Sequence, residues 1–205
     1  MKKSEKSGSR TLLWSVIMSS PGPIVVGIGL LMGKSSTQTA DFVRRSAELL
    51  AIIVSYIVYS ITTKDGFTDE IRKARLERNT DLFVGAAMCL GGGMMLLLAL
   101  LPGSGESGNV IPGLSIAILG VIANSIFWFR YSKLGTESGN SILLVQSRLY
   151  RAKTLVDFCV TAALLSVALI PGSPLSYWLD KAGSAVVAVY LIHTGVRTIG
   201  ERLKK

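Results

Sequence analysis

One helical turn separates Lys153 from Asp157 in the segment SRLYRAKTLVDF, which runs from Ser147 to Phe158. The segment leads directly into VTAALLSVALI, an apolar stretch that is typical of a membrane helix. Residues four apart lie on the same face of a helix, so this ammonium and this carboxylate can pair along it. Ionisable side chains inside a membrane span are costly and usually belong to functional sites. The pair is therefore the first candidate for chemistry in this chain.

More polar side chains occur at helical spacing in the apolar segments. Glu48 precedes Ser55 by seven residues and Tyr59 by eleven, which predicts one polar stripe along a helix. Gln146 lies seven residues before the lysine of the candidate pair and predicts a matching stripe on another helix. If the two stripes face each other, the core of the protein holds two acids and a lysine, with hydroxyl groups as hydrogen-bond partners.

The elements that must carry these stripes are membrane helices. The chain has 205 residues, of which 49% are hydrophobic, and a mean hydropathy of +0.48. Its apolar runs approach the roughly 20 residues that a helix needs to cross a bilayer, and they lack the alternation of barrel strands. We therefore predict an all-α membrane protein with six transmembrane helices. The predicted spans cover residues 12–32, 47–62, 82–101, 111–129, 153–170 and 182–198.

The distribution of basic residues predicts the orientation. An even number of spans places both termini on one side, and 18 of the 22 Lys and Arg residues fall on that side. Cytoplasmic loops carry the excess of Lys and Arg, so both termini are expected in the cytoplasm. The other side holds only Lys34, Arg44, Arg45 and Lys181. The two arginines are expected to form a solvated external ion cluster with Asp41.

This topology predicts the domain organisation and the environment. We expect a cytoplasmic tail over residues 1–10, a six-helix domain over 11–200 and a second tail over 201–205, without a soluble C-terminal domain. The net charge of +9 then faces anionic lipid headgroups. No segment interleaves basic and aromatic residues on a soluble module, which argues against nucleic acid binding. The expected location is the cell membrane of a bacterium or archaeon.

Signals for an enzyme or a resident cofactor are lacking. The chain has one histidine and no nucleophile, zinc-protease or phosphate-loop motif. Cys89 and Cys159 fall in predicted spans, where they are expected to be small packing residues. Gly91 to Gly93 lie in the middle of a span, where close helix packing is the first explanation and an unwound or kinked segment the second. We therefore predict no enzymatic activity, no cofactor and no resident metal.

Four local patterns resemble the transmembrane domain of the cation diffusion facilitator family, over roughly residues 10–203. ARLERNTDLFVG resembles the family's G-h-G-[RK]-x-E-x-L entry to the third span, with Glu77 at the acidic position. VIANSIFWFRYSK resembles the fourth span, with Asn124 at a polar position. NSILLVQSRLYRAKTLVD resembles the entry to the fifth span. YWLDKAGSAVVAVYLIHTGVRTI resembles the sixth span, with Asp180 as its Asp and Lys181 where Pro is usual.

The resemblance implies a homodimer that exchanges protons for divalent cations, but the residues depart from it at the transport site. The family's tetrahedral site uses an [HD]-x-x-x-D pair on span two and another on span five, which suits zinc. The alignment places Ser55 and Tyr59 at the first pair, and Leu149 and Lys153 at the second. None of the four is a carboxylate or an imidazole. The usual metal site is therefore expected to be absent.

Three interpretations are open. In the first, the protein is a transporter whose small ion or solute substrate and coupling proton are handled by Glu48, Asp157 and Lys153, with Ser55, Tyr59 and Asn124 along the path. In the second, a buried Lys–Asp pair is a structural lock in a non-transporting, regulatory membrane subunit. In the third, the lysine reaches the cytoplasmic interface and only the aspartate is buried.

Overall fold

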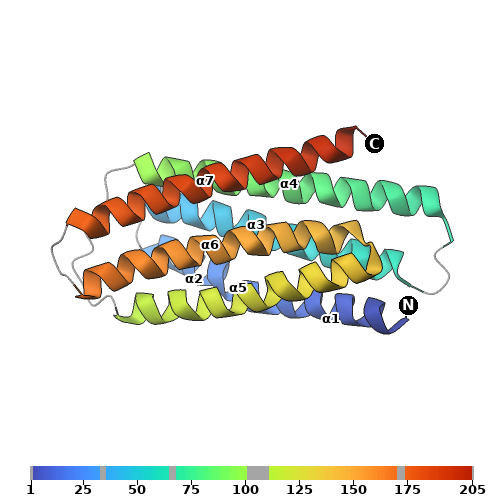
Figure 1. The fold of residues 1–205 in the computed structure, drawn as a ribbon, viewed down its shortest axis with the longest axis horizontal. Coiled ribbons are helices and arrows are strands. Elements are labelled where there is room, and N and C mark those ends of the chain that lie inside the picture. The colour runs from blue at the N-terminus through green and yellow to red at the C-terminus, as the bar shows by residue number, and fades with distance from the viewer. Residues whose placement is uncertain (1, 33–35, 65–67, 101–110, 170–173, 205) are drawn as a thin grey trace.

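The computed structural model describes residues 2–32, 36–64, 68–100, 111–169 and 174–204, and every regular element in these ranges is an α-helix (Figure 1). The prediction of an all-α bundle is confirmed. The helices are α1 (Lys2–Ser19), α2 (Pro21–Met32), α3 (Ser36–Thr62), α4 (Glu70–Leu100), α5 (Ile111–Ser138), α6 (Ser141–Leu169) and α7 (Pro174–Leu203).

The first predicted span consists of two helices, α1 and α2, that meet at Ser20. Pro21 has no N–H to donate to the preceding turn, and its ring clashes with the carbonyl there, so α1 ends and α2 begins at the proline. The Ser20 hydroxyl donates a hydrogen bond of 2.7 Å to the Val16 carbonyl and so helps to end α1. Together α1 and α2 follow the path of one span, and the other five spans are single helices.

The helices form a bundle in which neighbours in space are not always neighbours in sequence. α4 packs most extensively against α7, and α5 against α6, while α3 lies against α4 and also contacts α1, α2 and α6. The N- and C-termini lie at the same end of the bundle (Figure 1). The chain therefore has the even-span topology that the sequence predicts.

Glycines set the close approach of α4 and α7. A Cβ atom on Gly92 would lie 2.8 Å from the Ala188 carbonyl oxygen, and one on Gly195 would lie 2.7 Å from the Gly85 carbonyl oxygen. The two contacts are seven residues apart on each helix, so they repeat along one seam. Close packing, the first explanation for glycines at this level of α4, is confirmed at Gly92. α4 continues as a helix through this region, so it is not unwound there.

The surface of the bundle is apolar, as a lipid-facing surface must be. Within the described residues, three helical segments are long and apolar enough to cross a membrane by composition, Glu5–Ile28, Phe42–Thr62 and Glu70–Leu97. They coincide with the first three predicted spans. α5 carries an outward apolar stripe at helical spacing, made of Ile118, Leu119, Ile122, Ile126 and Phe129.

Candidate functional site

A polar pocket of about 420 Å³ lies inside the bundle, between the α1–α2 break, α3, α5 and α6. Small and apolar side chains make most of its wall. Its charged lining residues are Arg44, Arg45 and Glu48 of α3, and Lys153 and Asp157 of α6. The pocket therefore collects three basic and two acidic side chains at a level of the bundle where isolated charges would be costly.

Glu48 is the centre of this cluster. Its Oε1 atom lies 3.2 Å from Nη1 of Arg44, and its Oε2 atom lies 3.6 Å from Nζ of Lys153. The side chain of Glu48 is 6% exposed, that of Arg44 10% and that of Lys153 16%. A buried charge is tolerated when it is paired and hydrogen-bonded, and here each oxygen of one carboxylate faces its own cation.

The partner of Lys153 differs from the prediction. Within the described residues its ion pair is with Glu48 on α3, across the bundle, and not with Asp157 on its own helix. Its ammonium group also donates a hydrogen bond of 3.4 Å to Ser19 and lies 5.0 Å from the ring centre of Tyr150. The third interpretation, a lysine that reaches the membrane interface, is therefore wrong for this structure, because the side chain points into the pocket.

Arg44 also lies elsewhere than predicted. The sequence predicts Arg44 in a solvated cluster before the second span, whereas the structure buries it beside Glu48. The reason is that α3 begins at Ser36 and not at the first apolar residue, so the arginine belongs to the helix and not to a loop.

Asp157 is held from α5. Nδ2 of Asn124 donates a hydrogen bond of 2.6 Å to Oδ2 of Asp157. One turn before the asparagine is Gly120, where a Cβ atom would come within 2.7 Å of the same oxygen. The asparagine therefore supplies a donor and the glycine supplies space. The structure brings Asn124, Asp157, Lys153 and Glu48 together, as the sequence predicts for the core of the site.

Ser55 and Tyr59 lie outside the pocket, although the sequence predicts them as part of the path. The Ser55 hydroxyl donates to the Ala51 carbonyl at 2.8 Å and accepts a hydrogen bond of 2.8 Å from Nε2 of Gln146. The Tyr59 hydroxyl donates to the backbone carbonyl of Glu5 at 3.4 Å. Both side chains therefore connect α3 to neighbouring helices outside the pocket.

The residue pairs that line the pocket differ from the pairs that the alignment with the family predicts. The two pairs of residues four apart that meet in the pocket are Arg44 with Glu48 on α3 and Lys153 with Asp157 on α6. They lie eleven residues earlier on α3 and four residues later on α6 than the predicted pairs. A search for carboxylates and imidazoles passes over the α3 pair, because its first member is an arginine. A search for the same four-residue spacing that also accepts a basic residue at the first position would identify the α3 pair.

The described residues contain no group of three or more His, Cys, Asp or Glu side chains that could hold a metal ion. The acidic and basic groups of the pocket offset most of one another's charge. Two carboxylates can accept hydrogen bonds, and two guanidinium groups, an ammonium group and an amide can donate them. Such a set can bind a charged solute by exchanging internal partners for external ones.

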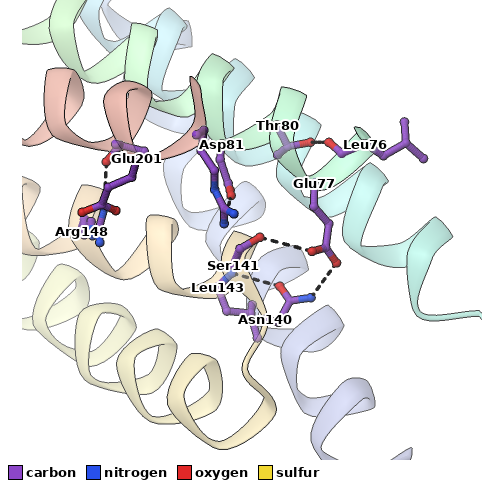
Figure 2. A network of polar contacts seen from close by, with 11 residues as sticks. Leu76, Glu77, Thr80, Asp81, Asn140, Ser141, Leu143, Arg148 and Glu201 are labelled. Carbon is purple, nitrogen blue, oxygen red and sulfur yellow. Dashed lines mark hydrogen bonds and ion pairs between the residues drawn. The ribbon is translucent and has the colours of Figure 1, made fainter. Parts of the chain in front are cut away.

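A second polar network lies at the end of the bundle that holds the termini (Figure 2). Glu77 of α4 accepts hydrogen bonds of 3.3 Å from Nδ2 of Asn140 and from the hydroxyl of Ser141. Asn140 also caps α6, since its side-chain oxygen accepts from the backbone N–H of Leu143 at 3.3 Å. Glu77 therefore fixes the α5–α6 turn against α4.

The same end ties α7 to its neighbours by ion pairs. Nη2 of Arg202 lies 2.5 Å from Oδ2 of the buried Asp81 on α4, and Nη1 of Arg148 lies 2.9 Å from Oε2 of Glu201 (Figure 2). The hydrogen bond from Arg197 is the main cause that holds the pKa of Glu201 below its ordinary value, with Arg148 adding to it. No pattern in the sequence predicts these ion pairs, because their partners come from α4, α6 and α7.

The helical bundle and its apolar surface define a multi-pass membrane protein. The chain belongs to the cation efflux family, since the model of the cation efflux transmembrane domain matches residues 12–205. The match confirms the resemblance to cation diffusion facilitators and covers all six predicted spans. No curated protein matches the chain. The family is one of membrane cation transporters and not of enzymes.

Proposed function

We propose that this protein is a secondary carrier of a small charged solute, in which Arg44 and Lys153 occupy the place of the family's transported metal ion. One observation carries this proposal. A pair of residues four apart on α3 and a second pair on α6 converge on one internal pocket, and each pair consists of one basic and one acidic residue. The four-residue spacing is the one that the family uses for metal ligands, but the charges here compensate one another.

Electrostatics disfavours a free divalent metal in this pocket. Two unit charges about 4 Å apart interact by about 4 kcal/mol at an effective dielectric constant of about 20, so a divalent ion is repelled by about 8 kcal/mol from each fixed cation at that distance. The carboxylates attract the ion, but Glu48 is engaged by Arg44 and Lys153, so a metal must break these contacts before it can be coordinated. Two carboxylates beside a guanidinium and an ammonium also make a poor metal cage.

The internal pairs supply a transport cycle for a charged solute. With the pocket empty, Glu48 is satisfied by two cations and Asp157 by an amide. Protonation of a carboxylate releases Lys153 from its internal ion pair, and the free ammonium then binds an entering solute. Departure of the solute and loss of the proton restore the internal pair, so solute and proton move together in this cycle, as in a symporter. The α1–α2 break lines the pocket, which is where irregular backbone is tolerated in a membrane protein.

The family and the distribution of basic residues support an oligomeric state, an orientation and a location for the carrier. The family supports a homodimer, and the excess of Lys and Arg at the end that holds the termini supports a cytoplasmic position for that end. We place the protein in the cell membrane of a bacterium or archaeon.

The test is flux in liposomes. The purified protein is reconstituted with an internal pH-sensitive dye and challenged with a panel of small charged solutes, alongside Lys153→Ala and Asp157→Asn. Lys133→Ala serves as the matched control, since Lys133 is an exposed lysine of α5 outside the pocket. We expect one solute class to move protons in the wild type and in the control, and both pocket variants to lose this flux.

The opposite outcomes are equally clear. Flux that survives in both pocket variants would contradict the role of the pocket. No flux for any solute, together with impaired folding of both variants, would contradict the carrier. That result would favour a structural or regulatory subunit held together by its buried charges, the alternative that the mutual satisfaction of these groups also supports.

A further inference from the structure

A second concave site, separate from the transport pocket, lies at the seam between α4 and α7. It has a volume of about 390 Å³ and is lined by Ile71, Ala74, Arg75, Arg78 and Arg202. None of its described lining residues is acidic. Three guanidinium groups therefore share one groove without a carboxylate in its wall.

The groove lies at the depth of lipid headgroups. Arg78 comes four residues before the predicted start of the third span, and Arg202 comes four residues after the predicted end of the sixth. At 1.5 Å per residue each is about 6 Å beyond the hydrocarbon edge. The headgroup layer extends about 5–8 Å on each side of the hydrocarbon core. Both arginines are therefore level with lipid phosphates, and Arg75 lies one turn further out.

One of the three arginines is fixed in place. Arg202 pairs with the buried Asp81 at 2.5 Å, and its side chain, 24% exposed, lines the groove. The neighbouring groove, of about 320 Å³, shares Arg202 and adds Lys204 together with Arg148 and Glu201, which pair with each other. Lys204 therefore extends the basic lining to the end of α7.

We propose that this α4–α7 groove binds the phosphate of an anionic phospholipid headgroup from the leaflet on the side of the termini. Guanidinium groups match phosphate oxygens in a bidentate geometry, and basic pockets between membrane helices on the cytoplasmic side bind anionic headgroups. The bound phosphate then bridges α4 and α7. The proposal is independent of the solute that the transport pocket takes.

The experiment measures lipid binding to the full chain in detergent by native mass spectrometry, with dioleoyl phosphatidylglycerol and dioleoyl phosphatidylcholine as probes. The test variant is Arg75→Gln with Arg78→Gln, which keeps the pair between Arg202 and its aspartate. The control is Arg72→Gln with Lys133→Gln, which removes the same charge from exposed positions outside the groove. Thermal unfolding of both variants without lipid verifies that they fold.

We expect the wild type to prefer phosphatidylglycerol, the control to match it, and the test variant to bind this lipid about 30-fold more weakly, from the loss of two basic contacts near the membrane surface. Equal losses in both variants would overturn the proposal, because they would show a general effect of net charge. Equal binding of phosphatidylcholine would overturn it as well. Displacement of the lipid by millimolar inorganic phosphate would assign the groove to free phosphate and would also overturn it.

Discussion

Replacing the two cations that contact Glu48 with metal ligands should convert the internal pocket into a zinc site. The change is Arg44→Asp with Lys153→His, which leaves Glu48 and Asp157 in place. The pocket then presents two pairs of N and O ligands, each pair four residues apart on α3 or α6, as a zinc site requires.

The magnitude follows from the distances. The Arg44 and Lys153 nitrogens lie 3.2 Å and 3.6 Å from the two oxygens of Glu48, so a metal on this carboxylate would lie close to both cations. Each cation about 4 Å from a divalent ion costs about 8 kcal/mol at an effective dielectric constant of about 20, or about six decades of affinity. Removing both therefore takes zinc binding from undetectable to measurable, even when rearrangement of the pocket absorbs most of this difference.

The assay is competition of Zn²⁺ with a fluorescent chelator, on protein in detergent. The matched control is Arg44→Gln with Lys153→Gln, which removes the same two cations without supplying ligands. We expect no binding by the wild type, weak binding by the control and clearly tighter binding by the ligand variant. Gel filtration and circular dichroism show that each variant is folded.

Two results would refute the reasoning. If the wild type binds Zn²⁺ as tightly as the ligand variant, the two cations do not exclude metal from the pocket. If the ligand variant folds but gains nothing over the glutamine control, α3 and α6 do not bring these four positions together.

Two further predictions concern packing and the support of the pocket. Gly92→Ala should lower the free energy of unfolding by about 1–3 kcal/mol, because its Cβ would lie 2.8 Å from the Ala188 carbonyl oxygen. Thermal unfolding measures this loss, with Gly93→Ala as the control, since a Cβ at Gly93 meets nothing within 4 Å. Equal effects of the two substitutions would contradict the prediction. Asn124→Leu should cost about 1–3 kcal/mol by removing the donor to Asp157. Adding Asp157→Leu to it should recover stability in the same assay, and a further loss would show that the hydrogen bond is not the cause.

The fold could be predicted because its signals are local. A run of about 20 apolar residues predicts a span on its own, and Lys and Arg in short loops predict its orientation. An apolar window does not predict the start of α3, because the first turns of this helix carry charges. Arg44 pairs with Glu48 one turn away, and a hydropathy average does not register compensation between two charges.

The site could be predicted only in part, because it depends on contacts between helices. The spacing of Lys153 and Asp157 was read correctly as one face of α6, but a spacing of four says nothing about competing partners on another helix. Glu48 on α3 forms an ion pair with the lysine, and Asn124 on α5 donates a hydrogen bond to the aspartate. Ser55 shares the helical periodicity of Glu48, which lines the pocket, so the pattern of one helix alone cannot establish which turn faces the pocket.

The most direct test of the central claim is zinc flux by the wild-type protein. Liposomes with and without the protein are given Zn²⁺ and a pH gradient, and both internal zinc and internal pH are followed. Because Arg44 and Lys153 hold the carboxylate that a metal would need, we predict zinc uptake no greater than in liposomes without protein. Saturable zinc uptake that dissipates the pH gradient would contradict the account.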